Sequence, residues 1–123
     1  MKAFNLLSVL LVAGSIGVVA SAHAQNAAHG AQVFESCAPC HATNGENSAG
    51  PGLGGIVGRK SGSVTGFRYS RAMKSANIVW NEKSLDAYLA APQEAVPGNV
   101  MPFSGIEDVR ERKDLIAYLE TLK

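Results

Sequence analysis

Residues 37–41 read Cys37-Ala38-Pro39-Cys40-His41, the pattern C-x-x-C-H. This pattern is the attachment signature of haem c. Two thiols at this spacing can add across the two vinyl groups on one edge of the porphyrin. The histidine that follows can then reach the iron from one face. The pattern therefore predicts one covalently bound haem c, with Cys37 and Cys40 as its thioether residues and His41 as an axial ligand of the iron.

Three other uses of the two cysteines compete with haem attachment. They are a disulfide between Cys37 and Cys40, a thioredoxin-type redox pair, and a zinc site. The redox pair needs a strand–helix context, and no strand pattern precedes Cys37. Zinc would need two further ligands close by, and the only other histidines or cysteines of residues 25–123 are His29 and His41. Haem attachment is the favoured interpretation.

The second axial ligand is predicted by elimination. Haem iron is bound by His, Met, Cys or Tyr, and residues 25–123 offer His29, Met73 and Met101. His29 lies on the predicted helix that leads to Cys37, which would hold it at the haem edge. Met101 lies in the segment Pro97–Phe103, where flanking prolines stiffen the chain. A stiff loop suits a ligand that crosses the haem face, so Met101 is predicted, with Met73 or an open iron as the alternatives.

The first 24 residues differ in composition from the rest. Lys2 precedes an almost entirely apolar stretch, 4–20, and the small residues of 21–24 form an A-x-A site that ends at Ala24. A basic start, an apolar stretch and such a site are typical of a secretory signal peptide. We expect cleavage after Ala24 and export to the periplasm. If residues 1–24 are retained they would be a membrane anchor, although about 17 apolar residues are short for a bilayer span.

Residues 25–123 are expected to form one monohaem domain, because this length suits a single domain and is too short for a multidomain enzyme. They carry ten basic and ten acidic residues. A net charge of zero argues against a nucleic-acid binder, which would have a broad basic footprint. No second long apolar run follows, so we expect no membrane insertion after cleavage. The segment 47–81 has no acid but contains Arg59, Lys60, Arg68, Arg71 and Lys74. These bases would neutralise haem propionates or form a docking patch for an acidic partner.

The hydrophobic pattern predicts an all-α fold, since no segment shows sustained strand alternation. Helices are expected over 27–36, 70–76, 82–91 and 108–122. Asn81 can cap the third helix, and Leu115, Ile116 and Leu119 form an apolar stripe on the fourth. No regular structure is expected in 43–62 or 92–105. Such loops are too long for an unassisted domain of this size, which is a further reason to place haem at its centre.

The order and spacing of several segments resemble class I cytochromes c, the small monohaem type of bacteria and mitochondria, over nearly all of residues 25–123. The matching segments are Cys37–His41, Gly50–Leu53, Gly58–Gly62, Gly66–Tyr69, Trp80, Tyr88-Leu89, Pro97–Phe103 and Asp114–Leu119. The resemblance implies short helices and long loops wrapped around one haem. It also implies that the N- and C-terminal helices pack together, with Gly30 and Phe34 against Leu115 and Tyr118.

The resemblance also implies further site residues. Pro51 would accept a hydrogen bond from His41, and Tyr88 would lie near the sulfur of Met101. The surroundings of the haem propionates would comprise Arg59, Tyr69, Trp80 and Asn99. One departure from the family concerns charge in the segment that carries Met101 (92–105, here called the ligand loop). Where mitochondrial members have lysines in this loop, the present sequence has Gln93, Glu94 and Val100.

The implied function is that of a monomeric periplasmic electron carrier rather than an enzyme. It would take electrons from a quinol-oxidising complex and deliver them to a terminal oxidase, a reductase or a photosynthetic reaction centre. Two alternatives stay open. One is a haem subunit bound to a single larger oxidoreductase, and the other is a haem protein that reacts with peroxide or NO if Met101 dissociates.

Overall fold

Long loops separate short helices in the computed structural model, which describes residues 24–123. The predicted signal peptide, except Ala24, lies outside the described residues. The helices are α1 (Ala27–Phe34), α2 (Arg71–Ser75), α3 (Glu82–Ala90), α4 (Pro92–Ala95) and α5 (Val109–Thr121). Within 24–123 the only strand-like feature is one isolated bridge between Lys60 and Val79. The all-α prediction is therefore confirmed.

Side-chain caps explain why four of these helices begin where they do, and Asn26 caps α1. The Asn81 side chain accepts a hydrogen bond from the Ser84 amide at 2.9 Å, and Ser84 reciprocates, which makes a capping box at the start of α3. Ser70 caps the short helix α2. Asp108 accepts hydrogen bonds from two amides in the first turn of α5. The four predicted helices are present, each within two residues of its expected ends.

The expectation that 92–105 contains no regular structure was wrong, because α4 occupies Pro92–Ala95. Pro92 stands in the first turn of α4, where its missing amide hydrogen has no helical partner to lose and its fixed φ suits the helix. The amides of Ala95 and Val96 donate to the carbonyls of Ala91 and Pro92, each at 3.0 Å. A single turn of helix leaves no periodic pattern in the sequence, which is why it was missed.

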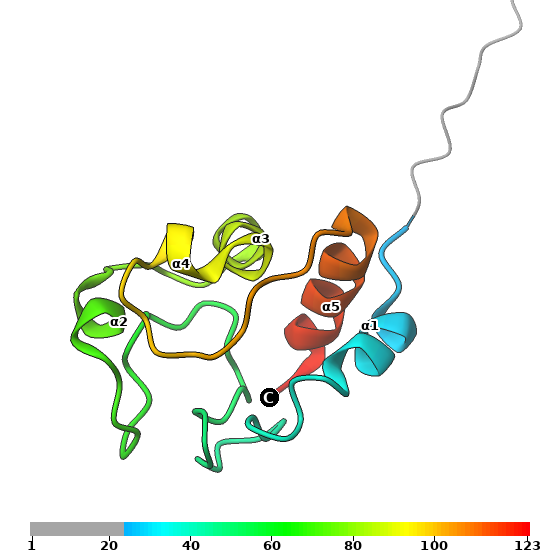
Figure 1. The fold of residues 1–123 in the computed structure, drawn as a ribbon. Helices are drawn as coiled ribbons and strands as arrows, with labels where there is room; N and C mark the ends of the chain where they lie inside the picture. The colour runs from blue at the N-terminus through cyan, green and yellow to red at the C-terminus, as the bar shows by residue number, and fades with distance from the viewer. Residues whose placement is uncertain (1–23) are drawn as a thin grey trace, which may run out of the picture.

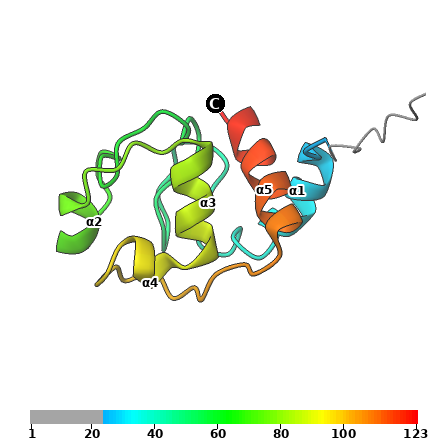
Figure 2. The ribbon, with the colours of Figure 1, turned by 90° about the horizontal axis from the view of Figure 1, so that it is seen from above.

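Helices α1 and α5 lie side by side in both Figure 1 and Figure 2, as the resemblance implied. A Cβ atom at position 30 would lie 2.8 Å from the Cβ of Tyr118, so only glycine lets the two backbones approach this closely. The ring of Phe34 packs on that of Tyr118, with 5.3 Å between their centroids. The side chain of His29 contacts Asp114 at 2.8 Å. These contacts hold the first and last helices of the described residues together.

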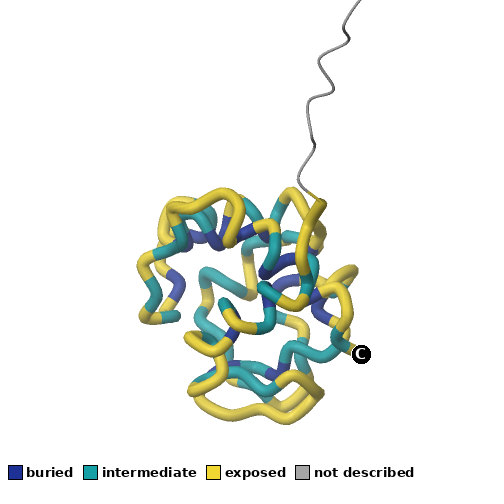
Figure 3. Tube along the Cα trace, turned by 90° about the vertical axis from the view of Figure 1, so that its right-hand side faces the viewer, coloured by how far each residue is buried: buried dark blue, intermediate teal, exposed yellow. Residues whose placement is uncertain are grey.

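The remaining helices lie on the other side of α5. Helix α3 packs against α5 and continues into α4, while α2 lies at the end of the molecule far from α1 (Figures 1 and 2). Exposed residues follow the outer loops, and short buried stretches are spread along the segments between them (Figure 3). Leu115 and Ile116 of α5 are the most deeply buried large side chains of the apolar core, together with Pro92. Among the helices of residues 24–123, none has the length and apolar character that crossing a bilayer requires.

Candidate haem site

The helices and loops enclose a cavity of about 430 Å³. It is lined by every residue predicted from the sequence for the haem site: Cys37, Cys40, His41, Pro51, Arg59, Tyr69, Trp80, Tyr88, Asn99 and Met101. Core side chains such as Phe34, Ile56 and Leu115 complete the wall. Segments that are far apart in the sequence therefore meet around one largely apolar space, which is the usual character of a cofactor site.

The imidazole of His41 is held by the backbone that faces it. Its Nδ1 lies 2.8 Å from the carbonyl oxygen of Pro51. Since a carbonyl can only accept, Nδ1 must carry the hydrogen, which leaves Nε2 as the nitrogen that can bind a metal. A Cβ atom at position 50 would lie 2.7 Å from Nδ1. Gly50 is therefore the residue that allows this approach, a role that the sequence analysis did not identify.

Hydrogen bonds fix the loop that carries Met101. The Asn99 side chain donates to the carbonyls of Pro92 and Val96, both at 2.9 Å, and accepts from the Met101 amide at 3.0 Å. Asn99 is 6% exposed. Both of its amide hydrogens are thus donated within the loop, and its expected place near a propionate stays a prediction.

The sulfur of Met101 also has a partner across the cavity. The hydroxyl of Tyr88 donates to Met101 Sδ at 3.8 Å. Burial raises the pKa of Tyr88 to about 12, so its phenol keeps this hydrogen at neutral pH. The ring of Tyr88 is in turn placed edge-on against Trp80, with 5.1 Å between centroids. Tyr88 therefore lies beside the Met101 sulfur, and its role next to an iron ligand stays a prediction.

The residues expected around the propionates have clear structural partners. The guanidinium of Arg59 donates to the carbonyls of Gly52, at 2.9 Å, and of Gly54. Arg59 therefore holds the loop that contains Pro51, in addition to bringing a positive charge to the cavity wall. The hydroxyl of Tyr69 accepts a hydrogen bond from the Val64 amide at 3.2 Å. Burial raises the pKa of Tyr69, so it stays a neutral hydrogen-bond donor near pH 7.

The surroundings of the two cysteines do not suit a redox-active dithiol. The sulfurs are not bonded to each other. Burial raises the pKa of Cys37, whereas a nucleophilic cysteine needs a lowered pKa, often at a helix N-terminus. Here α1 ends at Phe34, before the motif begins. Within residues 24–123, no group of three or more His, Cys, Asp and Glu residues is placed to hold a metal ion.

The other two side chains considered as ligands, His29 and Met73, occupy different places. His29 pairs with Asp114 at the contact of α1 with α5 and is not part of the cavity lining. Met73 does line the cavity, from α2. Within residues 24–123, Met101 is the methionine whose sulfur accepts a hydrogen bond. The same wall includes Phe67, which stacks edge-on with Tyr69 and which the sequence analysis did not assign to the site.

The family model named cytochrome c matches residues 27–123. The chain belongs to the cytochrome c family. It is 48% identical over 100 residues to cytochrome c of Euglena viridis, covering 80% of this chain and 98% of that one. It is 43% identical over 104 residues to cytochrome c2 of Blastochloris viridis, covering 83% and 82%. The solved structure of cytochrome cH from Methylobacterium extorquens superposes with a TM-score of 0.76 at 40% identity, covering 78% of this chain and 98% of that one.

As a cytochrome c, the chain carries one covalently attached haem c, and the predicted fold and cofactor are confirmed. The residues present fit this group. The side chains of Cys37, Cys40, His41 and Met101 line a cavity whose walls are otherwise mostly apolar. The hydrogen bond at His41 Nδ1 leaves the other ring nitrogen available as a ligand.

Proposed function

We propose that this cytochrome c is a periplasmic one-electron carrier whose haem iron is ligated by His41 and Met101. One observation carries the proposal: the two side chains line the same cavity, and each is held by its own hydrogen-bond partner, Pro51 for His41 and Tyr88 for Met101. The bound haem supplies one-electron exchange between ferric and ferrous iron. With both His41 and Met101 bound, the iron would have no open coordination position for a substrate, which favours a carrier over an enzyme.

The protein side chains would tune this exchange. The Pro51 carbonyl increases the electron donation of the His41 ring by accepting its Nδ1 hydrogen. Tyr88 keeps the Met101 sulfur directed into the cavity, and the backbone hydrogen bonds of Asn99 restrain the loop behind it. Apolar walls exclude water and so disfavour the additional positive charge of the oxidised state. Methionine ligation acts in the same direction and raises the reduction potential.

The carrier would accept electrons from a quinol-oxidising complex and pass them to a terminal oxidase, a reductase or a reaction centre. The cytochrome c2 of Blastochloris viridis and the cytochrome cH of Methylobacterium extorquens are bacterial relatives that support a place in such a chain. Electron-transfer encounters use small, short-lived interfaces. A monomeric carrier meets that requirement.

Visible spectra of the exported protein test the ligation, using Met101→Ala and the matched variant Met73→Leu. We expect the parent and Met73→Leu to show the weak far-red ferric band of iron–sulfur ligation and no response to CO. Met101→Ala should lose the band and bind CO when reduced. Loss of the band in Met73→Leu instead would assign the sulfur to Met73. Rapid CO binding by the parent would replace the carrier with a peroxide- or NO-reactive haem protein.

A further inference from the structure

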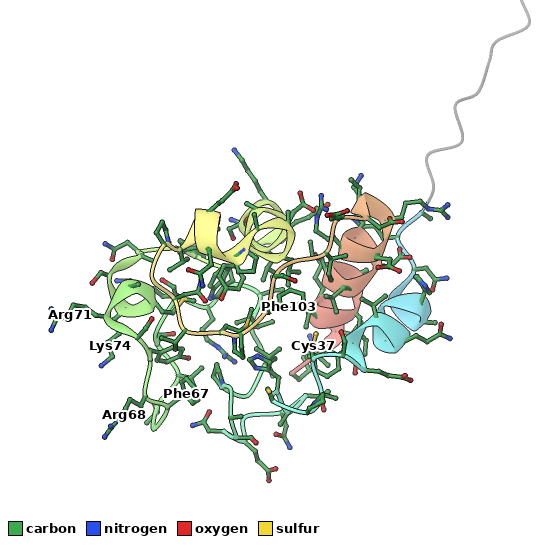
Figure 4. The ribbon with its side chains drawn as sticks, viewed as in Figure 1. Cys37, Phe67, Arg68, Arg71, Lys74 and Phe103 are labelled. Carbon is green, nitrogen blue, oxygen red and sulfur yellow. The ribbon has the colours of Figure 1, made fainter. Side chains whose placement is uncertain are left out.

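The loop that follows the haem motif contains an asparagine–glycine pair, Asn44-Gly45. Both residues are exposed, and the segment after Cys37 forms the lower edge of the molecule in Figure 4. Asparagine is a chemically labile residue, because the backbone nitrogen of the next residue can attack its side-chain carbon Cγ. Glycine favours this attack, since it has no side chain in the way and adopts backbone conformations that other residues avoid. Whether the reaction occurs in a folded protein depends on how both groups are held.

The attacking nitrogen, that of Gly45, is available. Its N–H donates no hydrogen bond to any acceptor of residues 24–123, so no such bond has to be broken before the attack. A Cβ atom at Gly45 would meet nothing within 4 Å, which shows that the space around it is open. Water can therefore reach the reacting groups, and ammonia can leave.

The side chain of Asn44 is held in a position that favours the attack. Its Oδ1 accepts a hydrogen bond from the Glu46 amide at 2.9 Å. The ring closed by this hydrogen bond includes the Gly45 nitrogen, so the carboxamide is folded back beside that nitrogen. The Glu46 amide also faces the oxygen on which negative charge develops when the nitrogen adds to Cγ, and a donor in that position stabilises the transition state. The leaving nitrogen, Nδ2, has no hydrogen-bond partner among residues 24–123.

Asn47, in the same loop, provides an internal comparison. It is also exposed and precedes a small residue, Ser48. Its Nδ2 donates to the Thr65 carbonyl at 3.0 Å, and its Oδ1 accepts from the Gly52 amide at 3.2 Å, so the carboxamide is fixed on both sides. The Ser48 amide donates to the Gly50 carbonyl at 2.9 Å. Reaction at Asn47 would disturb all three hydrogen bonds, whereas the reacting nitrogens of the pair at 44–45 have none to lose.

We propose that Asn44 is a site of spontaneous deamidation in the folded protein. The Gly45 nitrogen loses its proton to solvent and forms a bond to Cγ of Asn44. The bond from Cγ to Nδ2 breaks, and Nδ2 regains a proton from solvent and departs as ammonia. Water then opens the five-membered succinimide ring. Opening at Cγ gives aspartate at position 44, opening at the α-carbonyl gives isoaspartate, and neither step oxidises or reduces any atom.

The modification would act on the loop that holds the imidazole of His41. The Asn44 carbonyl accepts a hydrogen bond from the Gly54 amide at 2.9 Å, and a Cβ atom at Gly52 would clash with the same oxygen. Pro51, whose carbonyl faces His41, directly precedes this close contact. In isoaspartate the main chain runs through Cγ and is longer by one carbon, and the former carbonyl becomes part of a free carboxylate. The packing of position 44 against 52–54 therefore has to rearrange.

Mass spectrometry of the haem-loaded protein, incubated near neutral pH and then digested, tests the site. A glutamate-specific protease cuts after Glu46 and so separates Asn44 from Asn47. We expect a mass increase of about 1 Da at position 44, where NH₂ becomes OH. Gly45→Ala, which has room for its Cβ, should slow the reaction roughly tenfold. In Ser48→Gly, position 47 also precedes a glycine, but it should react roughly tenfold more slowly than position 44 or less, because its hydrogen bonds must break.

Two results would overturn the proposed site. One is a parent protein that keeps its original mass at position 44, and the other is equal reaction at positions 44 and 47 in Ser48→Gly. Amide hydrogen exchange tests the effect on the loop: in the fraction that isoaspartyl methyltransferase labels, the Gly54 amide should exchange faster than in fresh protein. The Trp80 amide, which donates to the Arg59 carbonyl, is the control and should not change. Unchanged exchange at Gly54 would refute the effect on the loop. Neither measurement depends on the iron ligands, so failure of the carrier proposal would leave both results unaffected.

Discussion

Replacement of Gly30 by alanine tests the contact between the first and last helices. A Cβ atom at this position would lie 2.5 Å from the carbonyl carbon of Asp114 and 2.8 Å from the Cβ of Tyr118. Carbon atoms in good contact are about 3.5–4.0 Å apart. One of the two clashing groups is backbone, which cannot rotate away. Helices α1 and α5 would therefore have to separate by roughly 1 Å.

Two effects of opposite sign decide the outcome. Alanine favours the helical conformation of α1 by about 1 kcal/mol relative to glycine. Overpacking of a close contact costs about 1–3 kcal/mol or more, and the upper end applies because separation also weakens the Phe34–Tyr118 contact and the His29–Asp114 pair. We expect a net loss of about 2 kcal/mol in the free energy of unfolding, equivalent to roughly 8–16 °C in Tm for a domain of this size.

Guanidinium denaturation followed by the fluorescence of Trp80, the single tryptophan, measures this loss. Gly45→Ala is the matched control, because a Cβ atom at Gly45 would meet nothing within 4 Å. It should change the free energy of unfolding by no more than about 0.5 kcal/mol. An unchanged or increased stability of Gly30→Ala would show that the two helices can move apart without cost, and the reasoning from close approach would be refuted.

Two further substitutions test how the ends of the chain and α5 are held. Arg112 is 8% exposed and its guanidinium binds a carboxylate and two backbone carbonyls. Arg112→Met should lower the free energy of unfolding, measured in urea, by about 2 kcal/mol. This loss is smaller than for a fully buried ion pair, because the Asp86 carboxylate is 42% exposed. An equal loss in Arg110→Met, at an exposed position, would contradict this prediction. The Asn26 amide and the His29 side chain lower the pKa of Asp114. The resulting stability is present above about pH 4 and lost as the pH falls through the lowered pKa, so Tm measured from pH 7 to pH 2 should fall less steeply in Asp114→Asn.

Local signals made much of the fold predictable. The spacing of Cys37, Cys40 and His41 is dictated by covalent chemistry, so it indicates haem without knowledge of the fold. Helix α3 has a cap that acts within four residues, and α5 has a regular apolar stripe. Such patterns need only neighbours along the chain, and for that reason the predicted bounds agree closely with the structure.

The assembly of the site was less accessible from the residues alone. Elimination led from three candidates to Met101, and the resemblance supplied Pro51, Tyr88 and the propionate residues. The role of Arg59 shows the limit of such reasoning. Its charge indicates an anion nearby, but the sequence does not reveal that the carbonyls of the Pro51 loop face its guanidinium. Contacts of this kind depend on the path of the backbone, which no side-chain pattern encodes.

The ligand loop shows how one physical requirement can be met by means that the sequence only partly reveals. Prolines on either side of Met101 predicted a stiff loop, and they do limit the backbone. The structure adds α4 and the Asn99 side chain, which together connect the loop to Pro92 and to the Met101 amide. Proline restricts φ only at its own position, whereas these hydrogen bonds restrain the loop as a unit. The position of the Met101 sulfur therefore depends on Asn99 as well as on the prolines that flank it.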